Sequence, residues 1–265
     1  MLETGRRSLK PDKITVAIVG AGNVATRLSL ALHAAGVGIE SVSASHIESA
    51  RRLAAQVGAR AVPVREISAC TDYVLVVVSD KAVAEVAASL PPTDAIVAHT
   101  SGSVPLETLA GRFRSAAVLY PLQTFSRDVG VDVGEVPFFT EATDAATLEA
   151  VDHLAHVLSD HVYHADSEQR KSLHVAGVLT SNFPIYLLEM ARQALAKAGY
   201  PLEVVEPLAR ASIAKAFAVG PREALTGPAR RGDVAVTELQ AQSLPPQHRA
   251  IYESITQSIL KDYHE

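Results

Sequence analysis

The stretch Ile14-Thr-Val-Ala-Ile-Val-Gly20-Ala-Gly22-Asn23-Val24-Ala25 decides the fold. Six apolar or β-branched residues lead into a Gly-x-Gly-x-x-Ala turn, and an Ala- and Leu-rich helical pattern follows from Thr26 to Ala35. Gly20 allows the tight turn, and Gly22 lets a pyrophosphate approach the backbone. The exposed N–H groups at the start of the helix meet the phosphate charge, and we assign Asn23 and Val24, in the turn before it, to the cofactor as well. The stretch predicts a dinucleotide site, with a plain strand–helix turn as the alternative.

The bulk composition indicates a globular protein of one or two domains. The chain has 265 residues, of which 48% are hydrophobic, and a formal net charge of −5. This charge gives no general attraction to nucleic acid or to an anionic membrane. No apolar run reaches the roughly 20 residues that span a bilayer. The single Cys70 rules out an internal disulfide, and we therefore expect a cytoplasmic protein.

Strand and helix patterns alternate as far as about residue 165. This alternation is typical of a doubly wound parallel sheet. From Ser167 onward nearly all the patterns are helical. We therefore predict an α/β fold with a Rossmann dinucleotide-binding domain over residues 13–165. An all-helical substrate and dimerisation domain is expected over residues 166–265.

The end of the second strand pattern bears on the choice between NAD and NADP. An acidic residue there holds the ribose hydroxyls of NAD, but the strand ends in Ser43-Ala-Ser45-His46, and Glu40 sits at its wrong end. Ser45, His46 and Arg51 could instead contact a 2′-phosphate. We expect NADP as the cofactor, in preference to NAD. The alternative is that these residues merely begin the next helix, with Ser45 as its cap.

Polar turns follow three further predicted strands, at the sheet edge where ligands of open α/β sheets bind. Each turn taken alone has a plainer interpretation, because Asp80 and Ser103 could simply cap helices. Together they outline a cleft. We assign Ser79, Asp80, Thr100 and Ser101 to the cofactor and Ser103, Gln123 and Thr124 to the substrate.

One predicted helix carries Lys171, His174 and Asn182 as a polar stripe. In a regular helix Lys171 and Asn182 fall within about 20° of each other, with His174 about 60° to one side. His174 could pass a proton near neutral pH, Lys171 could bind or protonate an oxygen, and Asn182 could orient substrate or nicotinamide. We expect these three to be the catalytic residues. The alternative is a polar seam between domains or subunits, and Pro184 should kink or end the helix.

A second polar group lies in the turn Thr226-Gly-Pro-Ala-Arg230-Arg231-Gly-Asp233. Two arginines in a turn could hold a carboxylate or phosphate. We assign Arg230, Arg231 and Asp233 to substrate binding. The alternative is a solvated basic loop in which Asp233 caps the next helix. No pattern of histidines and cysteines predicts a metal site.

Several of these motifs, taken in order, resemble one family. The motifs are His-Thr-Ser-Gly-Ser at 99–103, Pro-Leu-Gln-Thr-Phe at 121–125, Lys-Ser-Leu-His with Ser-Asn-Phe at 171–183, and Thr-Gly-Pro-x-x-Arg-Gly-Asp at 226–233. They resemble the Rossmann-like proteins with a C-terminal DUF2520 domain, a branch of the 6-phosphogluconate dehydrogenase-like oxidoreductases. The resemblance implies an NADP-dependent oxidoreductase that pairs through its helical domain. Tyr120 departs from the pattern, which has His before Pro-Leu-Gln.

We therefore expect hydride transfer between nicotinamide and a small, acidic substrate in an interdomain cleft. Two other functions stay open. One is a nucleotide-binding sensor or scaffold without turnover, and the other is an imine reductase of the pyrroline-carboxylate type. Fold alone does not decide among the three.

Overall fold

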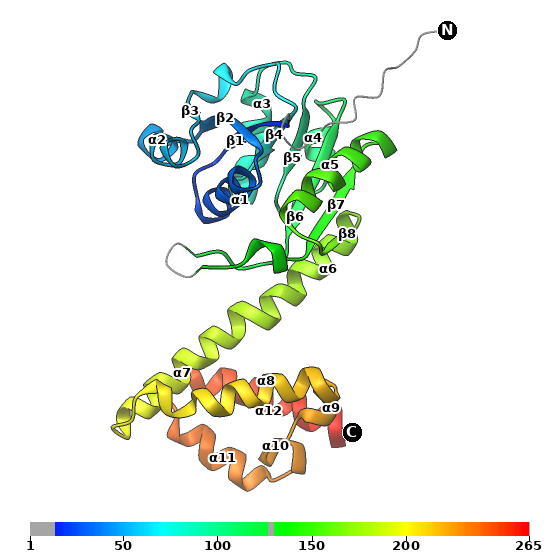
Figure 1. Cartoon of the computed structure of the whole chain (residues 1–265). Coiled ribbons are helices and arrows are strands. Elements are labelled where there is room, and N and C mark those ends of the chain that lie inside the picture. The colour runs from blue at the N-terminus through cyan, green and yellow to red at the C-terminus, as the bar shows by residue number, and fades with distance from the viewer. Residues whose placement is uncertain (1–13, 127–129, 265) are drawn as a thin grey trace. The chain divides into compact units, whose positions relative to one another are not determined.

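The computed structural model describes residues 14–126 and 130–264, which divide into two compact units. The first unit runs to Thr180 and the second begins at Ser181 (Figure 1). Residue 13, the predicted start of the Rossmann domain, lies outside the described residues. The first helix after residue 165 belongs to the first unit, because its side chains pack on the sheet. Each unit is described by itself below.

The first unit is built on an eight-stranded sheet in the order β3-β2-β1-β4-β5-β6-β7-β8. Its strands are β1 (Thr15–Val19), β2 (Gly38–Ser43), β3 (Arg60–Ala61), β4 (Tyr73–Val76), β5 (Ile96–His99), β6 (Ala116–Pro121), β7 (Phe138–Ala142) and β8 (Val162–His164). This order confirms the predicted α/β fold of the Rossmann type. One prediction is wrong: β7 runs antiparallel to β6. Parallel neighbours need a crossover, usually a helix, whereas the described part of this connection forms only the 3-10 helix η4 (Val133–Glu135).

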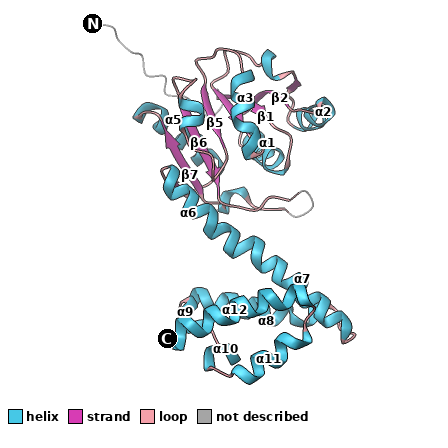
Figure 2. Ribbon diagram, turned by 180° about the vertical axis from the view of Figure 1, so that it is seen from behind, coloured by secondary structure: helices cyan, strands magenta, loops and turns pink. Residues whose placement is uncertain are grey.

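Helices cover both faces of the sheet (Figure 2). They are α1 (Asn23–Ala34), α2 (Ile47–Gln56), α3 (Val83–Ser89), α4 (Glu107–Ala110) and α5 (Ala145–Leu158), with the 3-10 helices η2 (Val64–Glu66) and η3 (Asp80–Ala82). Leucines of α1, α2 and α5 form one core with β1 and β2, whereas Val83 of α3 and Leu109 of α4 form the other with β4 and β5. Because β4 is buried along its whole length, it reads as a continuous apolar run.

A long helical stretch then carries the predicted polar stripe. It consists of α6 (Ser167–Gly177), the π-helical turn η5 (Val178–Asn182) and α7 (Phe183–Lys197). A capping box begins α6, since the Asp166 side chain accepts from the Gln169 amide and the Gln169 side chain accepts in return. Pro184 occupies the first turn of α7 and has no N–H to donate to Thr180. The predicted disturbance therefore takes the form of a π turn just before the proline, and the regular-helix angles do not hold across it.

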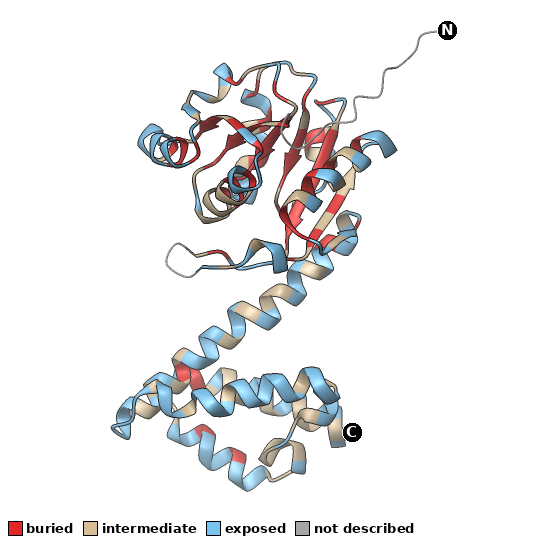
Figure 3. Cartoon of the chain, viewed as in Figure 1, coloured by how far each residue is buried: buried red, intermediate tan, exposed pale blue. Residues whose placement is uncertain are grey.

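The second unit consists of helices. After α7 come η6 (Leu202–Val205), α8 (Glu206–Val219), α9 (Pro221–Ala224), α10 (Pro228–Arg231), α11 (Val234–Ser243) and α12 (Pro246–His264). Its described residues are mostly exposed or half-buried, in contrast to the buried strands of the first unit (Figure 3). None of the described helices is both long enough and apolar enough to span a membrane.

Candidate functional site

The glycine turn lies between β1 and α1, at the point where the strand order reverses between β1 and β4. Gly20 has a φ of +135°, and a Cβ added there would lie 1.9 Å from the carbonyl oxygen of Val77. A Cβ added to Gly22 would meet nothing within 4 Å. Gly20 is therefore needed by the fold itself, whereas the backbone at Gly22 is open to a ligand. This fits a pyrophosphate at the start of α1, held by the N–H groups around Asn23 and Val24.

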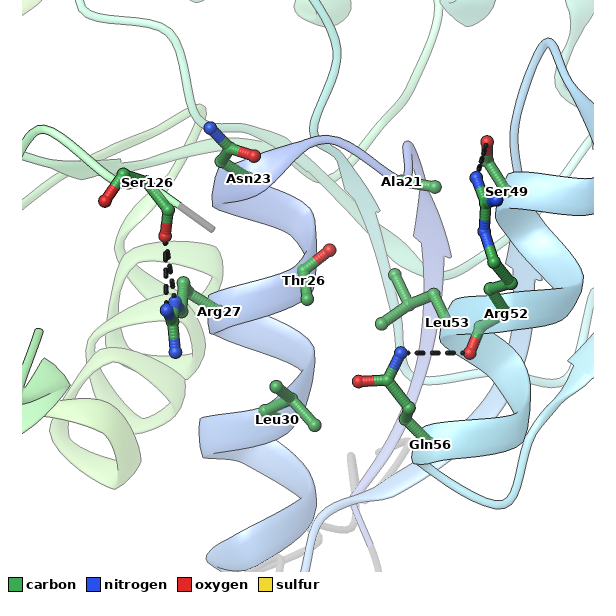
Figure 4. Close-up of a pocket in the computed structure, with 10 residues that line it drawn as sticks. All are labelled: Ala21, Asn23, Thr26, Arg27, Leu30, Ser49, Arg52, Leu53, Gln56 and Ser126. Carbon is green, nitrogen blue, oxygen red and sulfur yellow. Dashed lines mark hydrogen bonds between the residues drawn. The ribbon is translucent and has the colours of Figure 1, made fainter. Parts of the chain in front are cut away.

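A pocket of about 380 Å³ borders this turn and continues between α1 and α2 (Figure 4). It is lined by Ala21, Asn23, Thr26, Arg27, Leu30, Ser49, Arg52, Leu53, Gln56 and Ser126. The side chains of Asn23 and Arg27 also donate to the carbonyls of Phe125 and Ser126, which fastens the segment after β6 to α1. The pocket therefore brings together the glycine turn, two helices and the segment that follows the sixth strand.

The two neighbouring arginines of α2 are placed differently. Arg51 forms an exposed ion pair with Glu48 at 2.5 Å, whereas Arg52 lines the pocket and donates to the Ser49 hydroxyl at 3.1 Å. Ser45 and His46 are exposed where α2 begins, and His46, not Ser45, is its N-terminal flanking residue. Sequence reasoning chose Arg51 and missed Arg52. The buried residues Ala50, Leu53 and Ala54 define the inner face of α2. The positions of Arg51 and Arg52 relative to that face are the signal that could have distinguished the two arginines.

The turns after β4 and β5 meet, as the sequence predicted. The Ser103 hydroxyl donates to the carboxylate of Asp80, which begins the 3-10 helix η3 after Ser79. Within the second turn the Ser101 hydroxyl accepts from the amides of Ser103 and Val104 at 3.1 and 3.0 Å, and Thr100 is half-buried. Neither Asp80 nor Ser103 caps a helix with its side chain. The interpretation of Asp80 and Ser103 as helix caps is therefore wrong, and the two side chains bond to each other instead.

His99 ends β5 beneath these turns and is fully buried. Its Nδ1 accepts from the amide of Ser101 at 3.2 Å, so a neutral ring carries its proton on Nε2. Burial, and next the Arg170 charge, lower the pKa of His99 to about 4, while the Pro105 backbone and Asp80 act in the opposite direction. His99 is therefore neutral at physiological pH and supports the turn from below.

His174 lies against the same turns, together with Tyr120. Nδ1 of His174 is 3.3 Å from the hydroxyl of Tyr120, the last residue but one of β6. A Cβ added to Gly102 would lie 2.7 Å from Cζ of Tyr120 and 2.9 Å from Nδ1 of His174, so only glycine fits between them. Burial, and next the Asp80 charge, raise the pKa of Tyr120, which therefore stays protonated. The structure thus brings His174 to the predicted edge and adds Tyr120, for which sequence alone left the role in doubt.

A buried ion pair that sequence reasoning missed fixes α6 to the sheet. Arg170 is fully buried, pairs with Glu141 of β7, and donates to the carbonyl of Val104 at 2.6 Å. The Ser167 hydroxyl also donates to Glu141 and accepts from the amide of Leu106. A buried arginine has to be paired, but its partner lies 29 residues away in the sequence. Spacing along one helix could not reveal it.

The remaining predicted residues of the first unit are exposed. Lys171 pairs with Glu168 at 2.6 Å on the surface of α6. Gln123 accepts from the amide of Thr124 at 2.7 Å with its own side chain, in the segment after β6. Such exposed contacts are weak, so Lys171 and Gln123 could both exchange them for a ligand.

The other predicted residues belong to the second unit. Asn182 ends the π turn, and Arg231 pairs with Asp233 at 3.0 Å. Arg230 stacks on the ring of Tyr263 at 4.1 Å. The Asp233 side chain does not cap α11, contrary to the plainer interpretation of this turn. Within residues 14–126 and 130–264 there is no cluster of His, Cys, Asp and Glu that could hold a metal.

Comparison with known proteins places the chain in a family. Two family models match it: a Rossmann-like domain over residues 3–123 and a domain of unknown function, DUF2520, over residues 136–259. A solved structure from Bacteroides fragilis, provisionally named an NADP oxidoreductase, is 35% identical. The match covers 95% of this chain and 100% of the Bacteroides fragilis chain, with a TM-score of 0.89. The chain belongs to the Rossmann-like proteins with a C-terminal DUF2520 domain.

More distant structures share the fold of this DUF2520 protein. A Thermotoga maritima protein is 23% identical, with a TM-score of 0.77. The match covers 94% of this chain and 100% of the Thermotoga chain. A reductive aminase from Aspergillus terreus, solved with NADPH and ethyl-5-oxohexanoate, is 14% identical with a TM-score of 0.74, covering 94% of each chain. The name of the 35% identical Bacteroides fragilis protein agrees with the predicted dehydrogenase or reductase class and with NADP. A search of curated protein sequences found no match.

Proposed function

We propose that this protein is an NADP-dependent oxidoreductase. The observation that carries the proposal is the glycine turn, in which Gly20 is required by the fold and Gly22 faces open space at the start of α1. The 35% identical Bacteroides fragilis protein, named for NADP, supports the same cofactor. The label 6-phosphogluconate dehydrogenase-like is part of the proposal, as is a cytoplasmic location, which rests on the single Cys70.

The residues that would hold NADP lie along the carboxyl edge of the first unit. Gly22, Asn23 and Val24 would take the pyrophosphate, and the turns with Asp80 and Thr100 would border the nicotinamide half. Arg52 joins the predicted set of Ser45, His46 and Arg51 as a candidate for the 2′-phosphate, because it lines the pocket beside the glycine turn. When bound, the cofactor would supply or accept a hydride.

His174 would exchange the accompanying proton with the substrate. It is exposed, it lies against the turn with Gly102 and Ser103, and its helix is anchored by Arg170. Lys171, three residues earlier on α6, has the exposed Glu168 as its one ion-pair partner within the described residues, so a substrate carboxylate could replace that glutamate. We therefore keep a small acidic compound as the substrate class. Contributions from Asn182, Arg230, Arg231 and Asp233 stay predictions.

We also propose that two copies pair through the helical unit. The exposed apolar side chains of this unit include Leu208 at 68%, Phe217 at 86% and Leu239 at 68%. Large exposed apolar surface marks an interaction site, and two-fold pairing of identical copies is the commonest arrangement. Light scattering at micromolar concentration should give the mass of a dimer, and a monomer would contradict the proposal.

The cofactor proposal is tested by titrating the free protein with NADPH and NADH. Gly22→Val fills the space left for the pyrophosphate and should abolish binding of both, while circular dichroism stays that of the folded protein. Gly111→Val is the control, because Gly111 follows α4 with a φ of −67° and an added Cβ would meet only the carbonyl oxygen of Glu107, at 3.7 Å. Undiminished NADPH affinity in Gly22→Val would contradict the assignment.

The catalytic proposal is tested with His174→Ala. Loss of a general acid usually lowers turnover by about 10² to 10⁴, and the NADPH affinity should stay the same. The test follows NADPH oxidation with a panel of small carbonyl and imine compounds, including acidic ones. Tight NADPH binding without turnover on any of them would favour the sensor, and turnover confined to cyclic imines would favour a pyrroline-carboxylate type of reductase.

A further inference from the structure

The pair formed by Tyr120 and His174 carries an inference about which ring nitrogen of the histidine does the work. The Tyr120 hydroxyl lies 3.3 Å from Nδ1, and the two ring centroids are 6.3 Å apart with planes tilted by 59°. This is the one hydrogen bond of the His174 ring within the described part of the chain. Nε2 is therefore left for a ligand on the exposed side of the residue.

The tyrosine side of this pair is held rigidly. Tyr120 is 7% exposed and lies at the end of the buried strand β6. Its ring contacts Phe139 of β7 at 6.4 Å, and Phe139 in turn stacks on Tyr163 at 5.4 Å. The backbone of Gly102 closes the space beside both the phenol and Nδ1. The hydroxyl therefore has little freedom to move away from the histidine.

The histidine side is held through its helix. Arg170, one turn before His174, joins α6 to Glu141 and to the carbonyl of Val104. Gly177, one turn after it, packs so closely on Leu122 that an added Cβ would lie 3.1 Å from that side chain. Fixed on both sides, α6 presents the same edge of the imidazole ring to Tyr120.

We propose that Tyr120 is a positioning residue, which accepts a hydrogen bond from Nδ1–H of His174 and so makes Nε2 the nitrogen that exchanges a proton with the substrate. The exchange with substrate depends on the proposed function, whereas the position of the proton on Nδ1 can be tested without it. In reduction the Nε2–H bond of the protonated ring breaks, and the proton goes to the substrate atom next to the carbon that gains the hydride. In oxidation Nε2 takes that proton back.

The position of the proton follows from this chemistry. Nε2 can accept a proton from substrate only when the neutral ring carries its hydrogen on Nδ1. A hydrogen bond from Nδ1–H to the phenol oxygen favours that form. Burial and the Asp80 charge raise the pKa of Tyr120, so the phenol stays neutral, and its oxygen keeps lone pairs that can accept from Nδ1–H. The arrangement resembles the general case in which the partner of one ring nitrogen fixes the role of the other.

The test is ¹⁵N NMR of the histidine rings in the full-length protein without ligand, at pH 8.5, above the usual histidine pKa of about 6.5. The His174 signal is identified as the one missing from His174→Ala. In the wild-type protein we expect Nδ1 to be protonated and Nε2 to be unprotonated. In Tyr120→Phe the fraction protonated on Nδ1 should fall by at least half. Tyr163→Phe, which alters the same aromatic row without touching His174, should leave the signal unchanged.

A second variant disturbs the same pair from the backbone side and leaves the phenol hydroxyl in place. Gly102→Ala inserts a methyl group 2.9 Å from Nδ1 and should disturb the same nitrogen by pushing the two rings apart. A neutral wild-type ring protonated on Nε2, or an Nδ1 signal that neither variant alters, would overturn the proposal. NADPH titration of the same samples tests the cofactor proposal separately, since neither outcome at Nδ1 changes what that titration should show.

Discussion

The two units of the chain differ in how they bury their side chains. In the first, β4 and β6 are buried along their whole length, and apolar cores lie on both faces of the sheet. In the described part of the second, the buried side chains are Met190, Thr237, Ala241 and His248 (Figure 3). Burial of apolar surface is the main driving force of folding. The first unit therefore contains its own source of stability, whereas the described part of the second buries much less apolar surface, which is what the proposed pairing of two copies would supply.

The largest expected effect comes from truncating one leucine to alanine in each unit. Leu154 of α5 is fully buried, whereas Leu208 of α8 is 68% exposed. Leu154→Ala should lower the free energy of unfolding by about 2–5 kcal/mol, because it leaves a cavity. Leu208→Ala should change the unfolding of the sheet unit very little. Urea unfolding followed by circular dichroism compares the two, and equal losses would break the contrast between the units.

The next effect concerns the pairing of helical units. Phe217 is 86% exposed, and Phe217→Glu places a charge on the surface proposed to pair. We expect association to weaken at least about 100-fold, or about 2.7 kcal/mol, with NADPH binding retained by the monomer. Tyr163→Glu, on the exposed last strand of the first unit, is the control and should remain a dimer in light scattering. The reverse pattern would place the interface on the sheet unit.

The sequence predicted those features that depend on neighbouring residues. Gly20 and Gly22 stand beside their strand and helix, so the turn could be recognised locally. The contacts of Tyr120 with His174 and of Arg170 with Glu141 join residues 54 and 29 positions apart, and no local pattern encodes them. The antiparallel direction of β7 could not be read from the strand pattern, because it follows from a connection that lacks a crossover helix. The polar stripe was drawn on a regular helix, but the π turn before Pro184 changes its angles.

A smaller effect is expected from the buried histidine of the first unit. The pKa of His99 is about 4 in the folded protein, below the usual value of 6.5. The unfolded chain therefore binds the proton first, and stability falls as the pH drops from about 6.5 toward 4. At pH 5 this costs about 2 kcal/mol relative to pH 7. In His99→Asn the amide oxygen can replace Nδ1, and this part of the acid sensitivity should disappear.

Urea unfolding of both proteins at pH 7 and pH 5 measures that difference. Other groups that titrate over this range contribute equally to the two proteins, so the comparison isolates His99. The same acid sensitivity in His99→Asn would mean that the ring is hydrated and protonated in the folded state. The core of the sheet unit would then be less dry than its burial indicates.

The smallest expected effect distinguishes the two arginines of α2. Arg51 is 62% exposed in its side chain and paired with Glu48, whereas Arg52 lies with Ser49 in the pocket that reaches Ala21 of the glycine turn. In Figure 4 the guanidinium of Arg52 points to Ser49. Neighbouring helical residues differ by about 100° in direction, so the two arginines do not reach the same phosphate from one face of α2. We expect Arg52 to hold it, with Ser49 keeping the guanidinium in place.

Arg52→Ala should therefore weaken NADPH binding about tenfold, or about 1.4 kcal/mol, and leave NADH binding unchanged, because only NADPH carries the 2′-phosphate. Arg51→Ala is the matched control and should alter neither affinity. Fluorescence titration of the wild-type protein and both variants with each cofactor measures the four changes. If Arg51→Ala alone reduced NADPH affinity, the phosphate would lie on the exposed side of α2 with Ser45 and His46, as the sequence first indicated. If both variants weakened NADH equally with NADPH, neither arginine would read the phosphate, and the effect would come from the fold of α2 itself.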